Sequence, residues 1–388
     1  MDFEPVEDHE AIREGIRRIC ADFTDEYWSE VDEAHEFPWR FYEALAEGGW
    51  VGIAIPDEFG GGGMGITEAS IMLEEIAASG AAMNGCSAVH LSIFGMEPVR
   101  RHGTPELVAE VLPRVASGEL HVAFGVTEPD AGTDTTAIRT RAVRDGDEYV
   151  VSGAKVWTTK APLCEMCLLL VRTTPREECA VPTDGMTLLL VDLRDPAVDI
   201  TPIPKLGRNA VVSCEVRYDG LRVPVGRRIG EEGQGFRYLL DGLNPERILL
   251  AAEALGIGRA ALRRAVQYGK DRVVFGRPIG QNQGLAFPLA EAHMKLRAAE
   301  LAIRDASRRF DDGLPCGEAA NTAKYLAAEA GFFACDRALQ THGGMGYARE
   351  YHVERYWREA RLMQIAPVSQ EMVCNYISAK VLGLPKSY

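Results

Sequence analysis

The sequence predicts an α+β protein made of three consecutive units. Apolar residues recur at helical spacing in the first part of the chain, strand and hairpin patterns replace them near Leu120, and long helical patterns return from Phe236 onward. We expect an N-terminal α-helical domain over residues 1–118, a central antiparallel β domain over 119–228 and a C-terminal four-helix bundle over 229–388. Because helices and strands are segregated along the chain, a parallel Rossmann-type sheet is not expected.

The N-terminal unit is predicted to start with a helix, whose apolar positions are Ile12, Ile16, Ile19, Cys20 and Phe23. Residues 41–50 and 68–79 continue the helical pattern. The glycine-rich stretch Gly60–Gly65 lacks the Gly-Lys-Ser/Thr ending of a phosphate-binding loop. We therefore interpret it as a connector.

The central unit contains an Asp-Gly hairpin signal at Asp145-Gly146, between candidate strands 139–144 and 148–152. Further strands are expected at 167–171, 187–191 and 214–218. The C-x-x-C pair Cys164 and Cys167 runs directly into an apolar strand and has no second ligand pair nearby in the sequence. We interpret it as strand packing rather than a zinc or redox site.

The C-terminal unit is predicted to contain four long helices, over residues 247–268, 285–310, 318–339 and 369–382. One segment, Gly256–Ala261, fits the dinucleotide pattern G-x-G-x-x-A. It lies inside an alanine-rich helical run rather than after a strand, so it predicts close helix packing instead.

Composition narrows the classes of partner. The 388 residues are 46% apolar and 26% charged, which is typical of a globular protein, and the formal net charge of −15 disfavours nucleic acids and anionic membranes. No apolar run approaches the roughly 20 residues that span a bilayer. The acidic N-terminal residues differ from a targeting peptide and the nine cysteines lack a disulfide framework, so we expect a cytoplasmic protein with reduced thiols and no metal.

Two neighbouring motifs indicate a flavin site. The stretch Phe124–Asp134 combines a strand end with a turn rich in proline, glycine and aspartate, and Lys155–Thr159 places the indole of Trp157 beside two hydroxyls. An isoalloxazine ring has an apolar end that stacks on aromatic rings and a polar end that takes hydrogen bonds. The two motifs together supply both kinds of surface.

These segments resemble the signature of the acyl-CoA dehydrogenase family. The match continues in order with Arg272–Ile279, Gln283 and Gln340–Tyr347, and similarity extends from about Ala11 to the C-terminus. The resemblance implies FAD as cofactor, an acyl-CoA substrate and an electron-transferring flavoprotein as electron acceptor. It also implies a homotetramer, a dimer of dimers, or a homodimer.

The resemblance assigns roles to individual residues. Those expected to line the flavin ring are Phe124, Val126, Thr127, Trp157 and Thr159, and those expected to clasp the adenine and pyrophosphate, from a neighbouring subunit, are Arg272, Phe275, Gln283, Gln340, Gly343 and Gly344. Thr133 is expected to reach FAD or the CoA arm, and Ser369 replaces the family's threonine near the flavin.

The catalytic base is expected at Glu246. Much of the family carries its base shortly before the last helix, where this chain has Pro367, whereas an isovaleryl-CoA-dehydrogenase-like branch carries it in a Glu-Arg pair, matched here by Glu246-Arg247. From the residues alone, Asn244 is a good N-cap and Pro245 a good first helical residue, which places Glu246 in a first helical turn. Such a position lowers the pKa of a carboxyl group and so opposes its use as a base.

Other assignments follow from the same segment. Arg247 and Asn244 are expected to contact substrate, Arg247 through a CoA phosphate or a carboxylate. Pro367 lacks the backbone N–H that holds the thioester oxygen in the family, so a shifted backbone or the flavin ribityl hydroxyl would have to replace it. Glu371 is a less favoured alternative base, expected on the exposed side of the last helix.

The predicted reaction is the α,β-dehydrogenation of an acyl-CoA thioester to the trans-2-enoyl-CoA. Two alternatives keep the same fold: a flavin monooxygenase or oxidase, and an acyl-CoA enzyme that eliminates a sulfinate or carboxylate. A third alternative is an FAD-binding protein without catalysis.

Overall fold

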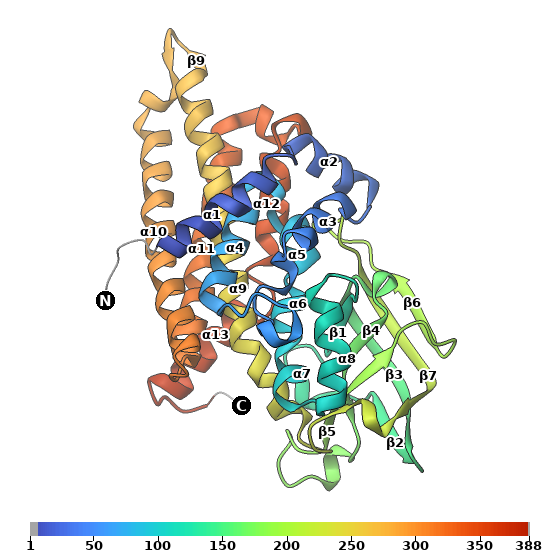
Figure 1. Ribbon diagram of the computed structural model, residues 1–388. Coiled ribbons are helices and arrows are strands. Elements are labelled where there is room, and N and C mark those ends of the chain that lie inside the picture. Colours follow the sequence, from blue (N-terminus) through green and yellow to red (C-terminus); the bar gives the residue numbers. More distant parts are fainter. Residues whose placement is uncertain (1–6, 387–388) are drawn as a thin grey trace.

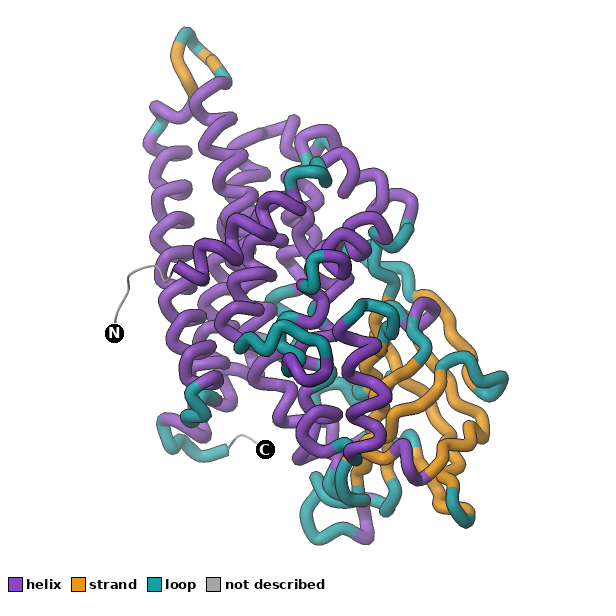
Figure 2. The backbone as a smooth tube through the Cα atoms, in the orientation of Figure 1, coloured by secondary structure: helices purple, strands orange, loops and turns teal. Residues whose placement is uncertain are grey.

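The computed structural model describes residues 7–386 and contains the three predicted units in the predicted order (Figure 1). Helices fill one side of the molecule, and the strands gather at the other except for a short hairpin at the tip of the helices (Figure 2). The N-terminal helices are α1 (Glu7–Cys20), α2 (Asp25–Ala34), α3 (Trp39–Glu47), α4 (Ile66–Ile76), α5 (Ala82–Val89), α6 (Leu91–Phe94), α7 (Glu97–His102) and α8 (Pro105–Ala116).

The central sheet is mostly antiparallel, as predicted. Its strands are β1 (Val122–Gly125), β2 (Arg141–Asp145), β3 (Glu148–Thr159), β4 (Met166–Arg172), β5 (Met186–Asp192), β6 (Val198–Pro202), β7 (Ser213–Pro224) and β8 (Arg228–Ile229). The order is β6-β7-β3-β2-β4-β5-β8, and β1 pairs with β4. The pairings of β4 with β1 and β2 are parallel, which the sequence pattern did not predict.

The sheet is covered on both faces. All residues of β4 are buried, because one face packs against α8 and the start of the C-terminal unit while the other closes a second apolar core with β3 and β7. Cys164 is buried just before this strand and Cys167 within it, and burial raises the pKa of each thiol to about 12. Their burial confirms strand packing.

The C-terminal unit is built on three long helices, α9 (Gly235–Asp271), α10 (Gln283–Asp311) and α11 (Gly317–His342), followed by α12 (Val353–Leu362) and α13 (Gln370–Tyr376). A short hairpin, β9 (Val273–Val274) with β10 (Arg277–Pro278), joins α9 to α10. A Cβ on Gly256 would meet the Glu74 carbonyl oxygen at 2.4 Å. The glycine pattern in α9 therefore serves close helix packing, as predicted.

The start of α9 differs from the prediction. The helix begins at Gly235, so Asn244 is not an N-cap and Pro245 lies inside the helix. Leu239 is buried, and Phe236 and Leu243 pack against the sheet core, so tertiary burial extends the helix through a proline that breaks helices elsewhere.

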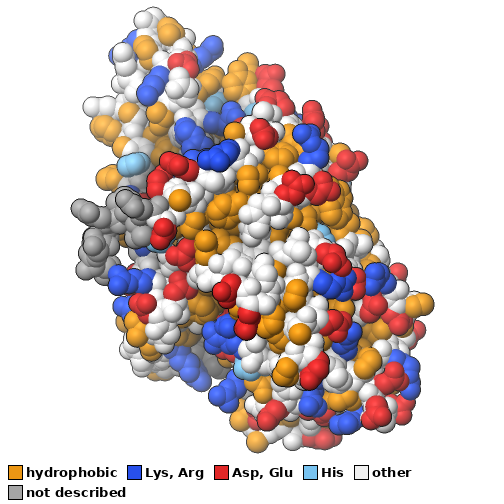
Figure 3. All heavy atoms as spheres, in the orientation of Figure 1, with side chains coloured by type: hydrophobic (Ala, Val, Ile, Leu, Met, Phe, Trp, Pro, Cys, Tyr) orange, Lys and Arg blue, Asp and Glu red, His pale blue; other side chains and the backbone are white. Residues whose placement is uncertain are grey.

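Two surface properties complete the description. On the face in Figure 3 acidic and basic side chains are interspersed rather than collected into one patch. Among residues 7–386, no helix combines the length and the apolar character that crossing a bilayer requires.

Candidate functional site

The two flavin motifs lie side by side where β1 ends. The Val156 N–H donates to the Thr127 carbonyl oxygen at 2.9 Å, and the Lys155 ammonium donates to the Val126 carbonyl oxygen at 3.0 Å. These bonds join the segment after β1 to the end of β3. Phe124, Val126, Thr127 and Thr159 are partly accessible there, and Thr133 is exposed on the following turn.

A buried ion pair fixes this junction. Lys155 Nζ lies 2.8 Å from Glu128 Oε1, and the Glu128 carboxylate also accepts from the Thr140 N–H at 2.9 Å. Burial opposes ionisation of Glu128, but Lys155 and these hydrogen bonds lower its pKa, while burial lowers the pKa of Lys155 to about 8. Glu128 and Lys155 thus hold the shape of the motif, a role that sequence reasoning missed.

Trp157 presents its indole to solvent from an irregular backbone. The pairing of β3 with β7 shifts register between Lys155 and Thr158, and Trp157 has φ of 64° and an exposed fraction of 55%. A bulge of this kind re-aims a side chain, and positive φ in a residue other than glycine costs about 1–3 kcal/mol. An exposed aromatic ring held at such a cost suits stacking against a flat heterocycle, so this surface fits an isoalloxazine ring. We use the name reaction end for Phe124–Thr127, Trp157 and Thr159 together with Glu246, which the family resemblance assigns to the same reaction.

Glu246 lies about three turns inside α9, not in its first turn. The helix dipole acts only on terminal turns, so the expected lowering of the pKa does not apply. Burial instead raises the pKa of Glu246 to about 7; Arg247 opposes this shift and Glu253 adds to it. Glu246 remains partly accessible, as a base that meets a ligand must be.

Asn244 and Arg247 form a pair near Glu246. The Arg247 guanidinium donates to Asn244 Oδ1 at 2.9 Å and interacts electrostatically with Tyr376 of α13. Burial lowers the pKa of Arg247. Asn244 therefore orients an arginine where α9 approaches α13, rather than capping a helix.

The loop before α13 carries the other residues named from the sequence. Ala366-Pro367 is a cis peptide, and Ser369 caps α13, its Oγ accepting from the Met372 N–H at 3.3 Å. Buried Lys324 holds this loop by donating to the Val368 carbonyl oxygen, and it also donates to Gln370 Oε1, at the start of α13, at 2.8 Å. Glu371 is exposed, and hydrogen bonds from its own backbone N–H and Ser369 lower its pKa, which makes it a poor base.

The six residues expected to clasp the dinucleotide gather at the opposite end of the bundle. Arg272, Phe275 and Gln283 belong to the hairpin and its flanks, while Gln340, Gly343 and Gly344 end α11. His342 stacks on Tyr268 of α9 with ring centroids 4.3 Å apart, which brings the two groups together. All six are exposed. We call this set the clasp end.

The backbone of the clasp end is open. Gly343 has φ of 60° and ψ of −135°, a conformation suited to glycine, and no atom of residues 7–386 lies within 4 Å of a Cβ added to Gly343 or Gly344. Phe275 has φ of 53° and its side chain is fully exposed. Figure 1 shows the hairpin at one extremity and the sheet at the other, so one chain does not bring the clasp end and the reaction end together.

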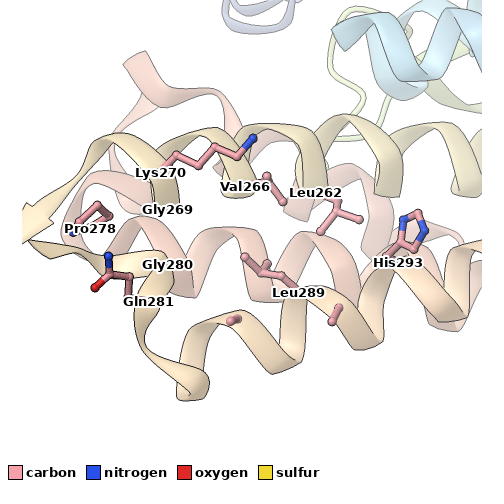
Figure 4. A pocket seen from close by; sticks show the side chains of 11 residues that line it. Leu262, Val266, Gly269, Lys270, Pro278, Gly280, Gln281, Leu289 and His293 are labelled. Atoms are coloured by element: carbon pink, nitrogen blue, oxygen red, sulfur yellow. The ribbon is translucent and has the colours of Figure 1, made fainter.

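An apolar cavity of about 550 Å³ lies beside the clasp end, along the stem formed by α9 and α10. Leu262, Val266 and Leu289 converge on it, with Lys270 and His293 at its edges (Figure 4). It is separate from Glu246.

Comparisons with known proteins agree along the whole length. Family models for acyl-CoA dehydrogenases match at residues 6–119 (N-terminal domain), 123–221 (middle domain) and 233–382 (C-terminal domain). Acyl-CoA dehydrogenase FadE12 of Mycobacterium tuberculosis is 38% identical over 388 residues, with 100% of this chain and 99% of the relative covered. The 3-(aryl)acrylate reductase of Clostridium sporogenes is 34% identical, covering 97% of this chain and 99% of the relative. The solved complex of glutaryl-coenzyme A dehydrogenase with glutaryl-CoA has a TM-score of 0.93 at 27% identity, covering 100% of this chain and 98% of that one.

Proposed function

The chain belongs to the acyl-CoA dehydrogenase family, and from this premise we propose that Glu246 is the base that removes the α-proton of an acyl-CoA thioester. Family and fold make the protein an FAD-dependent acyl-CoA dehydrogenase. One observation carries the assignment of the base: Glu246 is partly accessible, and burial raises its pKa to about 7. A base with a pKa near the working pH transfers protons efficiently.

The reaction needs a balanced exchange at the Cα–Cβ bond of the substrate. A Glu246 carboxylate oxygen takes the α-hydrogen as a proton, and the electron pair of that bond becomes the new double bond. When bound, FAD accepts the β-hydrogen with its two electrons. Arg247, held by Asn244, keeps a positive charge beside the base and is proposed, with Thr133, to meet polar groups of the CoA ester.

We propose that the reaction end orients the flavin ring. Trp157 stacks on its apolar part, and the hydroxyls of Thr127 and Thr159 take its polar part, with Phe124 and Val126 completing the wall and Ser369 nearby. The clasp end of a neighbouring chain is proposed to hold the adenine and pyrophosphate, with bare backbone at Gly343 and Gly344. Because Pro367 has no N–H, the thioester oxygen needs another donor, which we assign to a neighbouring backbone position.

Anaerobic mixing of the FAD-loaded protein with short, branched, medium and ring-bearing acyl-CoA esters tests the reaction. Loss of flavin absorbance with at least one ester is expected, and Glu246→Gln should abolish it while FAD stays bound. Glu371→Gln is the matched control, because it makes the same substitution at an exposed glutamate in the first turn of α13. Unchanged reduction in Glu246→Gln would show that the base lies elsewhere.

The reverse reaction is a second candidate, favoured by the likeness to the 3-(aryl)acrylate reductase. The same residues then act in the opposite sense, with protonated Glu246 delivering a proton to the α-carbon. Mixing dithionite-reduced protein with an enoyl-CoA separates the two directions. We also propose an electron-transferring flavoprotein as electron acceptor, and turnover that depends on added flavoprotein rather than on O₂ would distinguish it from an oxidase or monooxygenase.

A further inference from the structure

A group of buried polar residues lies between the N-terminal helices, α9 and the sheet. It consists of Ser87 and His90 from α5 and its end, Arg208 and Ser213 near the start of β7, and Glu253 from α9, and we call it the buried polar cluster. The Glu253 side chain has no exposed surface, and its Oε1 lies 2.8 Å from His90 Nδ1. Burying a carboxylate is costly, so this placement calls for a reason beyond packing.

Arg208 enters the buried polar cluster from a strained loop position. Its φ is 59°, unusual for arginine, and its guanidinium donates to Ser213 Oγ at 2.7 Å and to Ser87 Oγ at 3.3 Å. Burial lowers the pKa of Arg208, and the Glu253 carboxylate counteracts this. The strained backbone at Arg208 thus places a guanidinium near the buried Glu253 carboxylate.

Two atoms of the buried polar cluster keep unused hydrogen-bonding capacity. Glu253 Oε2 and Arg208 Nε are buried and have no hydrogen-bond partner among the residues that the structure describes. Nearly all buried polar groups in folded proteins are paired, so each of these two atoms needs a partner that the described residues do not supply. One of the two accepts a hydrogen bond and the other donates one.

The buried polar cluster lies inward of the reaction end. Glu253 follows Glu246 by two helical turns and so lies on the same face of α9. From the other side, the His90 ring lies 5.4 Å from that of Phe94, which in turn lies 6.3 Å from Phe124. Helix α6 contacts both α9 and β1, so it connects the helix that carries Glu246 and Glu253 to the strand that carries Phe124.

The position of the base sets the direction of the substrate. The Cα–Cβ bond must lie at Glu246, and the large charged CoA must stay towards solvent. The opposite end of the acyl group therefore points inward, towards His90 and Glu253. This step rests on the proposed function.

We propose that the buried polar cluster recognises the far end of the acyl group and selects an uncharged group that both donates and accepts a hydrogen bond, a hydroxyl or a carboxamide. Such a group donates to Glu253 Oε2 and accepts from Arg208 Nε. A carboxylate is repelled by Glu253 and an ammonium by Arg208. A methyl end leaves both buried atoms unpaired, and sites built to bind a hydroxyl discriminate strongly against analogues that lack it.

Binding to FAD-loaded Glu246→Gln tests the proposal without turnover. Unbranched acyl-CoA esters of graded length are compared in pairs. One member of each pair ends in a methyl group and the other in a hydroxyl group. Dissociation constants are measured from the perturbation of flavin absorbance. At the matching length the hydroxyl ester should bind roughly 10- to 100-fold more tightly than its methyl partner. Adding Glu253→Leu should remove this preference, whereas the isosteric Glu253→Gln should retain part of it.

Equal affinity of the paired esters at every length would overturn the proposal. The two unpaired atoms of the buried polar cluster would then bind internal water instead. If Glu253→Leu does not fold or loses FAD, Glu253→Gln and His90→Phe replace it as tests. A preference for the hydroxyl ester that is unchanged in both variants would also overturn the proposal. The two hypotheses fail separately. Methyl esters that reduce the wild-type flavin without any hydroxyl preference contradict only this proposal, whereas hydroxyl-selective binding without flavin reduction by any ester contradicts only the proposed function.

Discussion

The reaction end and the clasp end are built in opposite ways. At the reaction end the segment after β1 is joined to β3 by hydrogen bonds and by the buried Lys155–Glu128 pair, and Glu246 lies on a long packed helix. At the clasp end all six residues are exposed, on a hairpin and at a helix terminus. The contrast agrees with our proposal that chemistry is organised within one chain and that a neighbouring chain completes the clasp.

The two ends share one feature. Each presents an exposed aromatic residue with positive φ, Trp157 at the reaction end and Phe275 at the clasp end. Conformations of this kind cost about 1–3 kcal/mol and tend to occur at binding sites. The pair therefore indicates two separate surfaces prepared for a ligand or a partner.

Substitution of Glu246 should give the largest effect. The effect should be on the rate of flavin reduction and not on cofactor binding at the clasp end. Glu246→Gln is expected to slow flavin reduction by roughly 10²- to 10⁴-fold, the usual contribution of a general base, and to leave FAD retention unchanged. In the wild type the rate should rise about tenfold per pH unit below about pH 7 and level off above it, because only the ionised carboxylate accepts a proton. Stopped-flow reduction across pH checks both, and a profile without this bend would contradict the assignment.

The same residue also affects stability. The pKa of Glu246 is about 7 in the folded protein against 4.5 as its ordinary value, so the folded state binds more protons between these values. Stability should therefore fall as pH rises through this window, and Glu246→Gln should lessen the fall.

Removing the ion pair should be the next largest effect. Lys155→Met leaves the buried Glu128 carboxylate without its cation, which is expected to cost about 3–5 kcal/mol. Denaturant unfolding measures the loss, and adding Glu128→Gln should restore part of it. If Lys155→Met unfolds like the wild type, the reaction end is not held by this pair.

The clasp end should respond in cofactor affinity rather than stability. Phe275→Ala removes a ring that makes no buried contact in the single chain, so the melting temperature of the FAD-free protein should stay the same. If the ring is buried in an assembled site, FAD affinity should weaken by about 1.5–3 kcal/mol. Titration with FAD measures this, and an unchanged affinity would remove Phe275 from the clasp.

Gly343→Ala should give the smallest effect. Its φ of 60° disfavours a side chain, so a cost of about 1–2 kcal/mol is expected even though the space above it is open. Stability should fall modestly and FAD affinity with it. Gly146→Ala, at φ of 62° with open space in the hairpin of β2 and β3, is the matched control for strain, and it should affect stability alone.

The sequence was sufficient for the fold class because periodicity and turn signals are local. Asp145-Gly146 predicted the hairpin of β2 and β3. Three of the four helical patterns lie within α9, α10 and α11, whereas the fourth, over residues 369–382, contains only the short α13 followed by a π-helical segment, and α12 was not predicted. The start of α9 could not be predicted in this way. Pro245 has strong local preferences, and the packing of Leu239, Phe236 and Leu243 against a distant sheet outweighs them.

The site was predicted unevenly for the same reason. Motifs indicated Trp157 and Glu246, but the raised pKa of Glu246 depends on burial and on a position inside α9 that no motif records. Lys155 with Glu128, and His90 with Glu253, are pairs between segments far apart in the chain. Their partners become visible only when the chain is folded.

The bulge that turns Trp157 outward also provides an intrinsic fluorescent probe of FAD binding. An indole fluoresces, and a flavin stacked on it would quench that emission by energy and electron transfer. Of the five tryptophans, Trp157 has the largest exposed fraction, 55%. Tryptophan fluorescence should fall when FAD is added to the wild type but not when it is added to Trp157→Phe. This loss would measure FAD binding in the absence of substrate.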